Sequence, residues 1–415
     1  MRILFVAMAN SVHTARWINQ LNGRGWDIHL FPVTSVEEFG ISTELKETTV
    51  HHVLFGKQNG WHPSVREVDD FWPFLKNGWP LSRGSYRARR LVERWIPAWK
   101  DRTWALAQTI RKLRPDIIHS LEFQHGAYPV LDARRHLIGK FPPWIVTNWG
   151  SDIYLFGRLA EHAERVRAVL ASCNYYWCEC KRDVGLARSF GFNGEVLPVL
   201  PIAGGYEVAR FRQLRQPGLI SERRLILLKG YGGWAGRALV GLRALELSAA
   251  WLKGYRVAVY LASPETKIAA ELVSQSTGIP LDIIPPCSHE EMLRLHGQAR
   301  VSIGLSISDA ISTSLLEAMI MGSFPIQSRT SCGDEWLQCG KTGILVHPED
   351  PEGIAKAITR AVSDDTLVDQ AAEINAQVAA DRLDRCVIEP QVKAMYEKIA
   401  AENPNGDAIL NRAAS

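Results

Sequence analysis

Two carboxylate residues, Asp309 and Glu317, lie eight positions apart beside a run of hydroxyl side chains. The segment SIGLSISDAISTSLLEAMIMGSFPIQS has the pattern of a buried strand, a polar loop and a helix that begins at Ser312 or Thr313. Gly322 is suited to end that helix, and a proline soon after prevents its continuation. We therefore expect Asp309 in the loop and Glu317 one turn into the helix.

The start of such a helix is suited to bind a diphosphate. Its first backbone N–H groups have no partner within the helix and lie at the positive end of the helix dipole. Glu317 could accept hydrogen bonds from two neighbouring hydroxyl groups, as on a ribose, and Asp309 could hold a sugar hydroxyl or a developing positive charge. The alternative is an ordinary helix on which Glu317 faces solvent. The candidate residues of the helix start are Ser312, Thr313, Ser314 and Leu315.

A second candidate anion site lies in RLILLKGYGGWAGRALVGLRAL, which reads as strand, glycine-rich loop and helix. Lys229 is expected at the end of the strand and Arg237 at the start of the helix. Both are charged at neutral pH, and arginine can direct two donors at a phosphate. Gly232 and Gly233 allow the backbone to approach a ligand. The alternative is a surface lysine and an arginine on a solvated helix start.

Polar residues also follow the strands expected in the N-terminal half. Ligands bind beyond the carboxyl ends of parallel strands, so these residues are candidate ligand contacts. Asp152, in NWGSDIY, could hold a sugar hydroxyl, or it could be a helix N-cap. For His13, capping or packing is the alternative, and Glu179 is a weaker candidate at another strand end. The remaining candidates are Asn10, Ser11, His13, His119, Glu122 and Trp149.

Strands and helices alternate with short links in both halves, which predicts an α/β fold of two doubly wound Rossmann-like domains. The strands are expected at 2–8, 27–33, 116–119, in PPWIVTNWGSD and CNYYWCEC, and at 225–228, 256–261, 282–284, 301–305 and 324–327. We expect an N-terminal domain at 1–200, a linker at 201–218 and a C-terminal domain at 219–385. Residues 386–415 are expected to form a helix and tail that return to the N-terminal domain.

At Leu315-Leu316-Glu317-Ala318-Met319 the chain resembles the family 4 (group 1) retaining glycosyltransferases of the GT-B fold. Their signature is a Glu, seven residues, and a second Glu followed by Ala and Met. Gly322 and Pro325 match its continuation, whereas Asp309 stands in place of the first Glu. The following CGDEWLQCGKTGILVHPEDPEGIAKAI is also similar to the family. Residues 150–152 resemble its HGSD-like turn, with Asn148 and Trp149 where a His is often found.

The resemblance implies two domains that face each other across a cleft, and transfer of a sugar from a nucleotide-diphosphate donor to an acceptor hydroxyl with retention at the anomeric carbon. It implies no metal and no cofactor, because the cations and the helix start take the metal's place. The family order of the cations is Arg then Lys, whereas here Lys229 precedes Arg237. The implied catalytic residues are Asp309, Lys229, Arg237 and Asp152. The donor-binding residues are Gly232, Gly233, Ser312, Thr313, Ser314, Leu315 and Glu317, and the acceptor-binding residues are Asn10, Ser11, His13, His119, Glu122 and Trp149.

Three other functions remain as alternatives. A nucleotide-sugar epimerase of the same fold would turn over donor without an acceptor. A catalytically inactive nucleotide-sugar-binding protein would never release the nucleoside diphosphate, and Asp309 would then mark loss of the active site. A dinucleotide oxidoreductase is disfavoured, because the first strand is not followed by its glycine fingerprint.

The composition limits the setting in which this chemistry takes place. The 415 residues are 46% hydrophobic and carry a formal net charge of +4, which suits two globular domains and gives no sign of nucleic-acid binding. The seven cysteines form no CxxC pair, so we expect reduced, mostly buried thiols and no zinc site. The amino terminus lacks the features of a signal peptide, and no uncharged run approaches the roughly 20 residues of a spanning helix, so a cytoplasmic location is expected.

The acceptor is expected to be a carbohydrate, a lipid-linked molecule or another small molecule. Residues 83–114 are densely basic and include Trp95, Trp99 and Trp104. Tryptophan with arginine on a helix suits the inner face of a membrane or an anionic acceptor. The alternative is a solvated helix whose tryptophans pack on the sheet, so peripheral membrane contact is kept as one of two interpretations.

Overall fold

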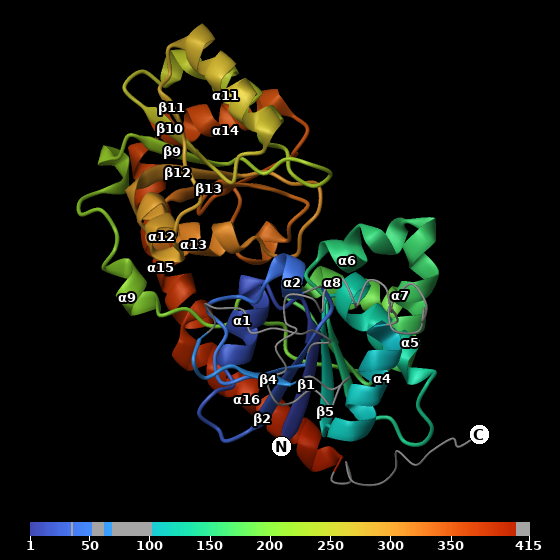
Figure 1. The fold of residues 1–415 in the computed structure, drawn as a ribbon. Helices are drawn as coiled ribbons and strands as arrows, with labels where there is room; N and C mark the ends of the chain where they lie inside the picture. Colours follow the sequence, from blue (N-terminus) through green and yellow to red (C-terminus); the bar gives the residue numbers. More distant parts are fainter. Residues whose placement is uncertain (35, 52–61, 69–101, 404–415) are drawn as a thin grey trace, which may run out of the picture. The chain divides into compact units, whose positions relative to one another are not determined.

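The computed structural model describes residues 1–34, 36–51, 62–68 and 102–403, which form two units, each built on a parallel sheet (Figure 1). The first unit comprises Met1–Glu179, Asp183–Gly204 and Glu389–Ser415, and the second comprises Cys180–Arg182 and Gly205–Ile388. Most of the basic segment 83–114 and all residues after Asn403 lie outside the described residues. Among the described helices, none is both long and apolar enough to cross a membrane.

The sheet of the first unit has the strand order β4-β3-β2-β1-β5-β6-β7-β8, and every described pair is parallel. The chain winds outward from the centre in both directions, so the order changes direction between β1 and β5. The strands are β1 (Arg2–Ala7), β2 (Asp27–Pro32), β3 (Thr49–His51), β4 (Arg66–Val68), β5 (Ile117–Leu121), β6 (Trp144–Thr147), β7 (Tyr175–Trp177) and β8 (Glu195–Val196).

Helices connect these strands, and the last helix of the chain packs on the same unit. The helices are α1 (Val12–Asn19), α2 (Val36–Phe39), α4 (Arg102–Leu113), η3 (Phe123–Ala127), α5 (Tyr128–Arg134), α6 (Ser151–Tyr154), η4 (Phe156–Arg158), α7 (Ala160–Ser172), α8 (Lys181–Ser189) and α16 (Arg385–Glu402). Tyr396 of α16 contributes its hydroxyl group to the core, where Trp17 Nε1 donates to it over 3.0 Å. The carboxyl end of the described chain therefore completes the amino-terminal core.

The sheet of the second unit has the order β11-β10-β9-β12-β13-β14, again parallel throughout. Numbered within the unit, this is the 3-2-1-4-5-6 order of a doubly wound nucleotide-binding sheet, whose direction changes between β9 and β12. The strands are β9 (Leu225–Lys229), β10 (Arg256–Tyr260), β11 (Leu281–Ile283), β12 (Ala299–Gly304), β13 (Phe324–Ser328) and β14 (Ile344–Val346). Both sheets together confirm the predicted α/β, doubly wound class.

The helices of the second unit cover both faces of its sheet. They are α9 (Val208–Arg212), η5 (Ile220–Glu222), α10 (Ala238–Leu247), η6 (Ala249–Trp251), α11 (Pro264–Thr277), α12 (His289–Gln298), α13 (Thr313–Met321), η7 (Gly333–Glu335), α14 (Pro351–Ser363) and α15 (Asp365–Leu383). The helix α9 lies within the predicted linker 201–218. The helix expected within 386–415 is α16.

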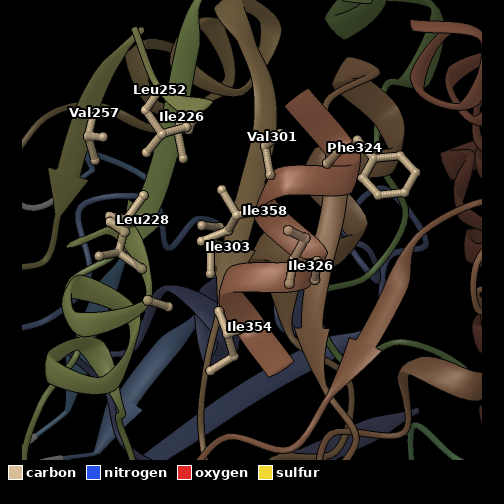
Figure 2. Packing of buried hydrophobic residues seen from close by; sticks show 14 of the residues in the cluster. Ile226, Leu228, Leu252, Val257, Val301, Ile303, Phe324, Ile326, Ile354 and Ile358 are labelled. Carbon is tan, nitrogen blue, oxygen red and sulfur yellow. The ribbon is translucent and has the colours of Figure 1, made fainter. Parts of the chain in front are cut away.

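Strand β9 is apolar on both of its faces, so helices must pack on both sides of the sheet. Successive side chains of a strand point to opposite faces, and all four of the strand's apolar residues are buried. Ile226 and Leu228 belong to the core beneath α10 and α14, and Figure 2 shows α14 placing Ile354 and Ile358 against that face of the sheet. The alternate residues Leu225 and Leu227 pack on the other face, with α12. The sheet is thus fixed between two helical layers.

Candidate active site

The two segments singled out for an anion site meet at the point where the second sheet changes direction. The glycine-rich loop follows β9, and the loop containing Asp309 follows β12. Arg237 N donates to Leu305 O over 3.1 Å, and Ile307 N donates to Ala235 O over 2.9 Å. Ligands of such sheets bind beyond the carboxyl ends of the strands at this point, so the structure brings the predicted residues to the expected edge.

Glycine is required where the two loops join. A Cβ atom on Gly236 would lie 1.8 Å from the carbonyl oxygen of Tyr231, which no side chain could tolerate. Gly233 has a φ of +68°, a left-handed conformation that glycine adopts without cost. Gly232 packs against Ser263, so a side chain there would also collide. The loop is held close to the strand ends by its own backbone.

The two predicted cations border this loop. Lys229 is the last residue of β9, and its Nζ lies 5.6 Å from the centre of the Tyr231 ring. Arg237 is the N-cap of α10 and forms an ion pair with Glu349. Its guanidinium also donates to the carbonyl oxygen of Gly236 over 2.8 Å. Both side chains are half-buried, so their charges lie at the carboxyl edge of the sheet.

Helix α13 begins where the sequence predicted, at Thr313, with Ser312 as its N-cap. The Ser312 side chain makes no cap hydrogen bond to the helix, and its hydroxyl instead lies 2.8 Å from that of Ser314. Gly322, with a φ of +86°, ends the helix as expected. A helix start without a side-chain cap leaves its N–H dipoles available to an anion.

Asp309 lies in the loop before this helix and is half-buried. Its Oδ1 accepts a hydrogen bond from Ala310 N over 3.0 Å. Its carbonyl oxygen accepts one from Arg182 Nη2 over 2.7 Å, within the second unit. The backbone at Asp309 is thereby fixed close to the start of α13.

Glu317 does not face solvent, so that alternative is wrong. It is 5% exposed, and its Oε1 lies 2.7 Å from His289 Nε2. Its Oε2 lies 4.0 Å from Nε2 of the fully buried His296. Burying a carboxylate costs free energy because the charge loses its hydration, so such a group needs partners that hold it. A buried carboxylate with partners is typical of a binding site.

Sequence reasoning missed three residues around Glu317. His289 and His296 come from α12, and Tyr260 ends β10. Burial raises the pKa of Tyr260, whose ring lies edge-on 6.0 Å from that of His296. The segment Ser288-His-Glu-Glu291 has the pattern of a capping box, which α12 confirms and which could have located the helix. Nothing in the local sequence indicated the contact with Glu317.

Three of the predicted acceptor residues, Ser11, His13 and Trp149, are linked by contacts in the first unit. Ser11 is the N-cap of α1 and accepts a hydrogen bond from His13 N over 3.2 Å. The His13 ring meets that of Trp149 edge-on at 5.8 Å, with both residues half-buried. Asn10 precedes them and is exposed.

The placement of His119 past the end of its strand is wrong. β5 continues to Leu121, so His119 lies within the strand and is fully buried. Its Nδ1 lies 2.6 Å from the hydroxyl of Tyr396 and its Nε2 lies 2.6 Å from that of Thr147. The apolar pattern that marked the strand contained a polar residue whose partners come from distant parts of the chain. His119 is therefore a core residue of the first unit.

Glu122 and Asp152 hold backbone turns at the ends of β5 and β6. Glu122, with a φ of +77°, accepts hydrogen bonds from the N–H groups of Gln124 and His125. Asp152 accepts from Trp149 N over 2.9 Å and from Phe123 N over 3.2 Å. Burial, together with the nearby Glu122 carboxylate, raises the pKa of Asp152 well above its usual range. Asp152 is not the N-cap of α6, a position that Gly150 occupies.

Glu179, the weaker candidate, is buried and accepts a hydrogen bond from the backbone N–H of Ile202 over 2.6 Å. The seven cysteines all lie within the described residues and form no disulfide there, and four of them are buried. In the described part of the chain, one group of three residues has the spacing of metal ligands, namely Cys180, Cys332 and Glu335. The two cysteines are far apart in sequence, so a search for short motifs could not find them. Three ligands are fewer than the four of a structural zinc site.

Two family models match the chain, one in each half. Residues 272–378, which include Asp309 and Glu317, match the glycosyl transferases group 1 model. Residues 100–175, which include His119, Glu122 and Asp152, match the glycosyl transferase 4-like model. Both models describe glycosyltransferases, so the chain is a glycosyltransferase whose residues 272–378 are similar to group 1. A comparison with curated proteins found no match for this glycosyltransferase.

Solved structures support the fold of this glycosyltransferase. It is similar to sucrose-phosphate synthase from Thermosynechococcus elongatus, with a TM-score of 0.66 and 16% identity over 97% of this chain and 100% of that one. HepE from Anabaena, solved in complex with UDP-glucose, has a TM-score of 0.62 and 12% identity over 96% and 100% of the two chains. A glycosyltransferase from Rickettsia africae has a TM-score of 0.60 and 14% identity over 96% and 98%.

Proposed function

We propose that this glycosyltransferase takes a sugar from a nucleotide-diphosphate donor and transfers it with retention of anomeric configuration, without a metal ion. The observation that carries the proposal is the pair of hydrogen-bonded loops at the carboxyl ends of β9 and β12. They combine two cations, Lys229 and Arg237, with the start of α13, which has no side-chain cap hydrogen bond. HepE, which has the same fold, was solved with UDP-glucose, and this supports a uridine nucleotide as the first donor to test.

The donor diphosphate would bind between the cations and the start of α13. Lys229 and Arg237 would neutralise the charge that develops on the diphosphate as the bond to the sugar breaks. The N–H groups at the start of α13, with the hydroxyls of Ser312 and Ser314, would hold phosphate oxygens. Arg237 would exchange its ion pair with Glu349 for the phosphate, because an ion pair with a solvent-exposed carboxylate contributes little.

Glu317 would accept hydrogen bonds from the two ribose hydroxyls of the donor. The bond between the anomeric carbon and the diphosphate oxygen breaks, and the acceptor oxygen forms its bond to that carbon from the same face. The acceptor proton passes to an oxygen of the departing diphosphate, so no side-chain nucleophile is needed. Asp309 would hold a hydroxyl of the transferred sugar or stabilise the positive charge on its ring.

The acceptor is assigned to the first unit. Ser11, His13 and Trp149 present hydroxyl, imidazole and indole groups next to the ends of β1 and β6. Glu122 and Asp152 shape the turns beside them by binding backbone N–H groups. Such a set of polar groups with an aromatic ring suits a hydroxyl-bearing acceptor.

The first test is Glu317→Ala, with Glu265→Ala as the matched control. Glu265 lies on α11 in the same unit and is fully exposed. Calorimetric titration with UDP, GDP and ADP should show at least about tenfold weaker binding for Glu317→Ala, because a carboxylate that accepts ligand hydroxyls is removed. The control should bind like the wild type. Equal affinity of Glu317→Ala and wild type would contradict the proposed donor site.

Turnover distinguishes this proposal from its alternatives. Released nucleoside diphosphate should increase when acceptor is added, and NMR of the product should show the anomeric configuration of the donor. Activity should persist in EDTA. Donor turnover with no transfer would favour an epimerase, and donor binding without release of nucleoside diphosphate would favour an inactive binding protein.

A further inference from the structure

The buried carboxylate of Glu317 depends on a partner from another helix. His289, the first residue of α12, lies with its Nε2 2.7 Å from Glu317 Oε1. The two residues are 28 positions apart in the sequence and belong to the same unit. Burial favours the protonated form of a carboxyl group, whereas a hydrogen bond donated to it favours the charged form. The contact with His289 also fixes the orientation of the Glu317 carboxylate.

His289 is itself held in place from two directions. Its helix begins with a capping box, in which Glu291 N donates to Ser288 Oγ over 3.2 Å and Ser288 N donates to Glu291 Oε2 over 2.7 Å. The ring of Phe211, from α9, meets the His289 ring edge-on at 5.8 Å. The imidazole is 28% exposed, so it is packed without being enclosed. A ring fixed in this way can define where the carboxylate points.

His296 lies seven residues further along α12, about two helical turns from His289, and its position relative to Glu317 is different. It is fully buried, its Nδ1 lies 3.0 Å from Ser302 Oγ, and its Nε2 is 4.0 Å from Glu317 Oε2. Burial lowers the pKa of His296 to about 4, so its ring is neutral near pH 7. At that distance it packs beside the carboxylate without a hydrogen bond. His289 is therefore the histidine that holds Glu317.

We propose that His289 is a positioning residue for nucleotide recognition, which by donating to Oε1 keeps the Glu317 carboxylate aimed at the ribose hydroxyls of the donor. The proposal rests on the proposed function, because it takes Glu317 as the ribose acceptor. His289 does not contact the nucleotide in this role. The property it controls is the distinction between ribose and deoxyribose. A ribose offers two neighbouring hydroxyls to one carboxylate, and a misaimed carboxylate cannot accept from both.

The test uses His289→Ala and His289→Gln, with Glu290→Ala as the control on the same helical turn. Glu290 is the next residue of α12 and pairs with Arg294 and Arg210. Affinities are measured by calorimetry for UDP and 2′-deoxy-UDP, with the GDP and ADP pairs alongside. Thermal unfolding of each variant verifies that it is folded.

In the wild type, the affinity for the deoxy form should be at least about tenfold weaker than that for the ribose form, because one hydrogen bond to a charged group is lost. His289→Ala should bind the ribose form about tenfold more weakly and reduce the preference for ribose to nearly one. His289→Gln, which can place an N–H near the same oxygen, should recover most of the preference. The control should keep the wild-type preference.

The outcomes separate the two proposals. If Glu317→Ala abolishes the ribose preference while folded His289→Ala keeps it, the role of His289 is refuted and the donor site stands. If the wild type binds none of these diphosphates, or has no ribose preference, the assignment of Glu317 to the ribose fails and the role of His289 fails with it. A drop in the affinity of His289→Ala for both sugar forms equally would show a structural effect only, and would also refute the proposal.

Discussion

Two histidines, His119 in the first unit and His296 in the second, are at most 1% exposed. Burial lowers the pKa of His119 to about 3 and that of His296 to about 4, because a charged imidazole would lose its hydration. An unfolded histidine has a pKa near 6.5. Below that pH the unfolded chain therefore binds protons that the folded chain does not.

The sign of the resulting pH dependence follows from this difference. Above about pH 6.5 these histidines are neutral in both the folded and the unfolded state, so their protonation does not reduce the free energy of unfolding. As the pH falls from 6.5 toward 4, stability should decrease, approaching about 1.4 kcal/mol per pH unit for each histidine. Urea unfolding at pH 7, 5.5 and 4.5 measures this slope.

His119→Asn isolates the contribution of the first unit. At pH 7 the variant should be about 1–3 kcal/mol less stable, because Tyr396 and Thr147 lose a hydrogen-bond partner. Its stability should then depend less steeply on pH. The exposed His136→Asn serves as the control and should keep the wild-type slope. An unchanged slope in His119→Asn would show that His119 is not the titrating group.

The sequence predicts the role of a residue correctly where that role depends on its neighbours in the chain. The start of α13 at Thr313 could be predicted because loop, cap and glycine end occur in one continuous segment. His289 and the burial of His119 could not, because their partners lie far away in the sequence. A contact over 28 or 277 positions leaves no local pattern.

At the level of elements, the site depends on how two loops join. The antiparallel bridge between Gly236 and Ser306 links the loop after β9 to the loop after β12. The bridge places the cation-bearing segment beside the segment that leads into α13.

Gly236→Ala tests this arrangement. The added methyl group would overlap the carbonyl oxygen of Tyr231, so the loop must move. We expect binding of UDP, GDP or ADP to weaken by about tenfold or more and the unit to lose stability, as is typical of backbone displacement. Gly185→Ala in α8 has open space around it and is the matched control. Wild-type affinity in Gly236→Ala, measured by calorimetry, would show that the bridge does not position the site.

The elements themselves were largely predictable, because parallel strands buried on both faces have nearly continuous apolar sequences. The strands expected at 225–228, 256–261 and 324–327 differ from the observed ones only at their ends. The short helix α9 was not expected inside the segment 201–218, which was interpreted from its glycines and prolines alone. Phe211 of α9 gains its importance from packing on His289, which composition cannot show.

At the scale of the whole molecule, every residue assigned to the donor belongs to the second unit. Hydrogen exchange should therefore report where a nucleotide binds. UDP, or whichever of UDP, GDP and ADP binds, should slow exchange of backbone amides in 229–237 and 305–317, because ligand binding suppresses local opening. Amides of β1 and β5 serve as the internal control and should change little. Protection confined to the first unit would place the donor elsewhere.

The two ends of the described chain meet in a single core, since Tyr396 of α16 supplies the hydroxyl group that Trp17 and His119 bind. On the ribosome, residues 205–388 of the second unit are all translated before that tyrosine is made. Until Tyr396 is made, Trp17 and His119 of the nascent first unit therefore lack this hydrogen-bond partner, whereas most of the second unit can already fold. In this protein, the half that is synthesised first is the half that is finished last.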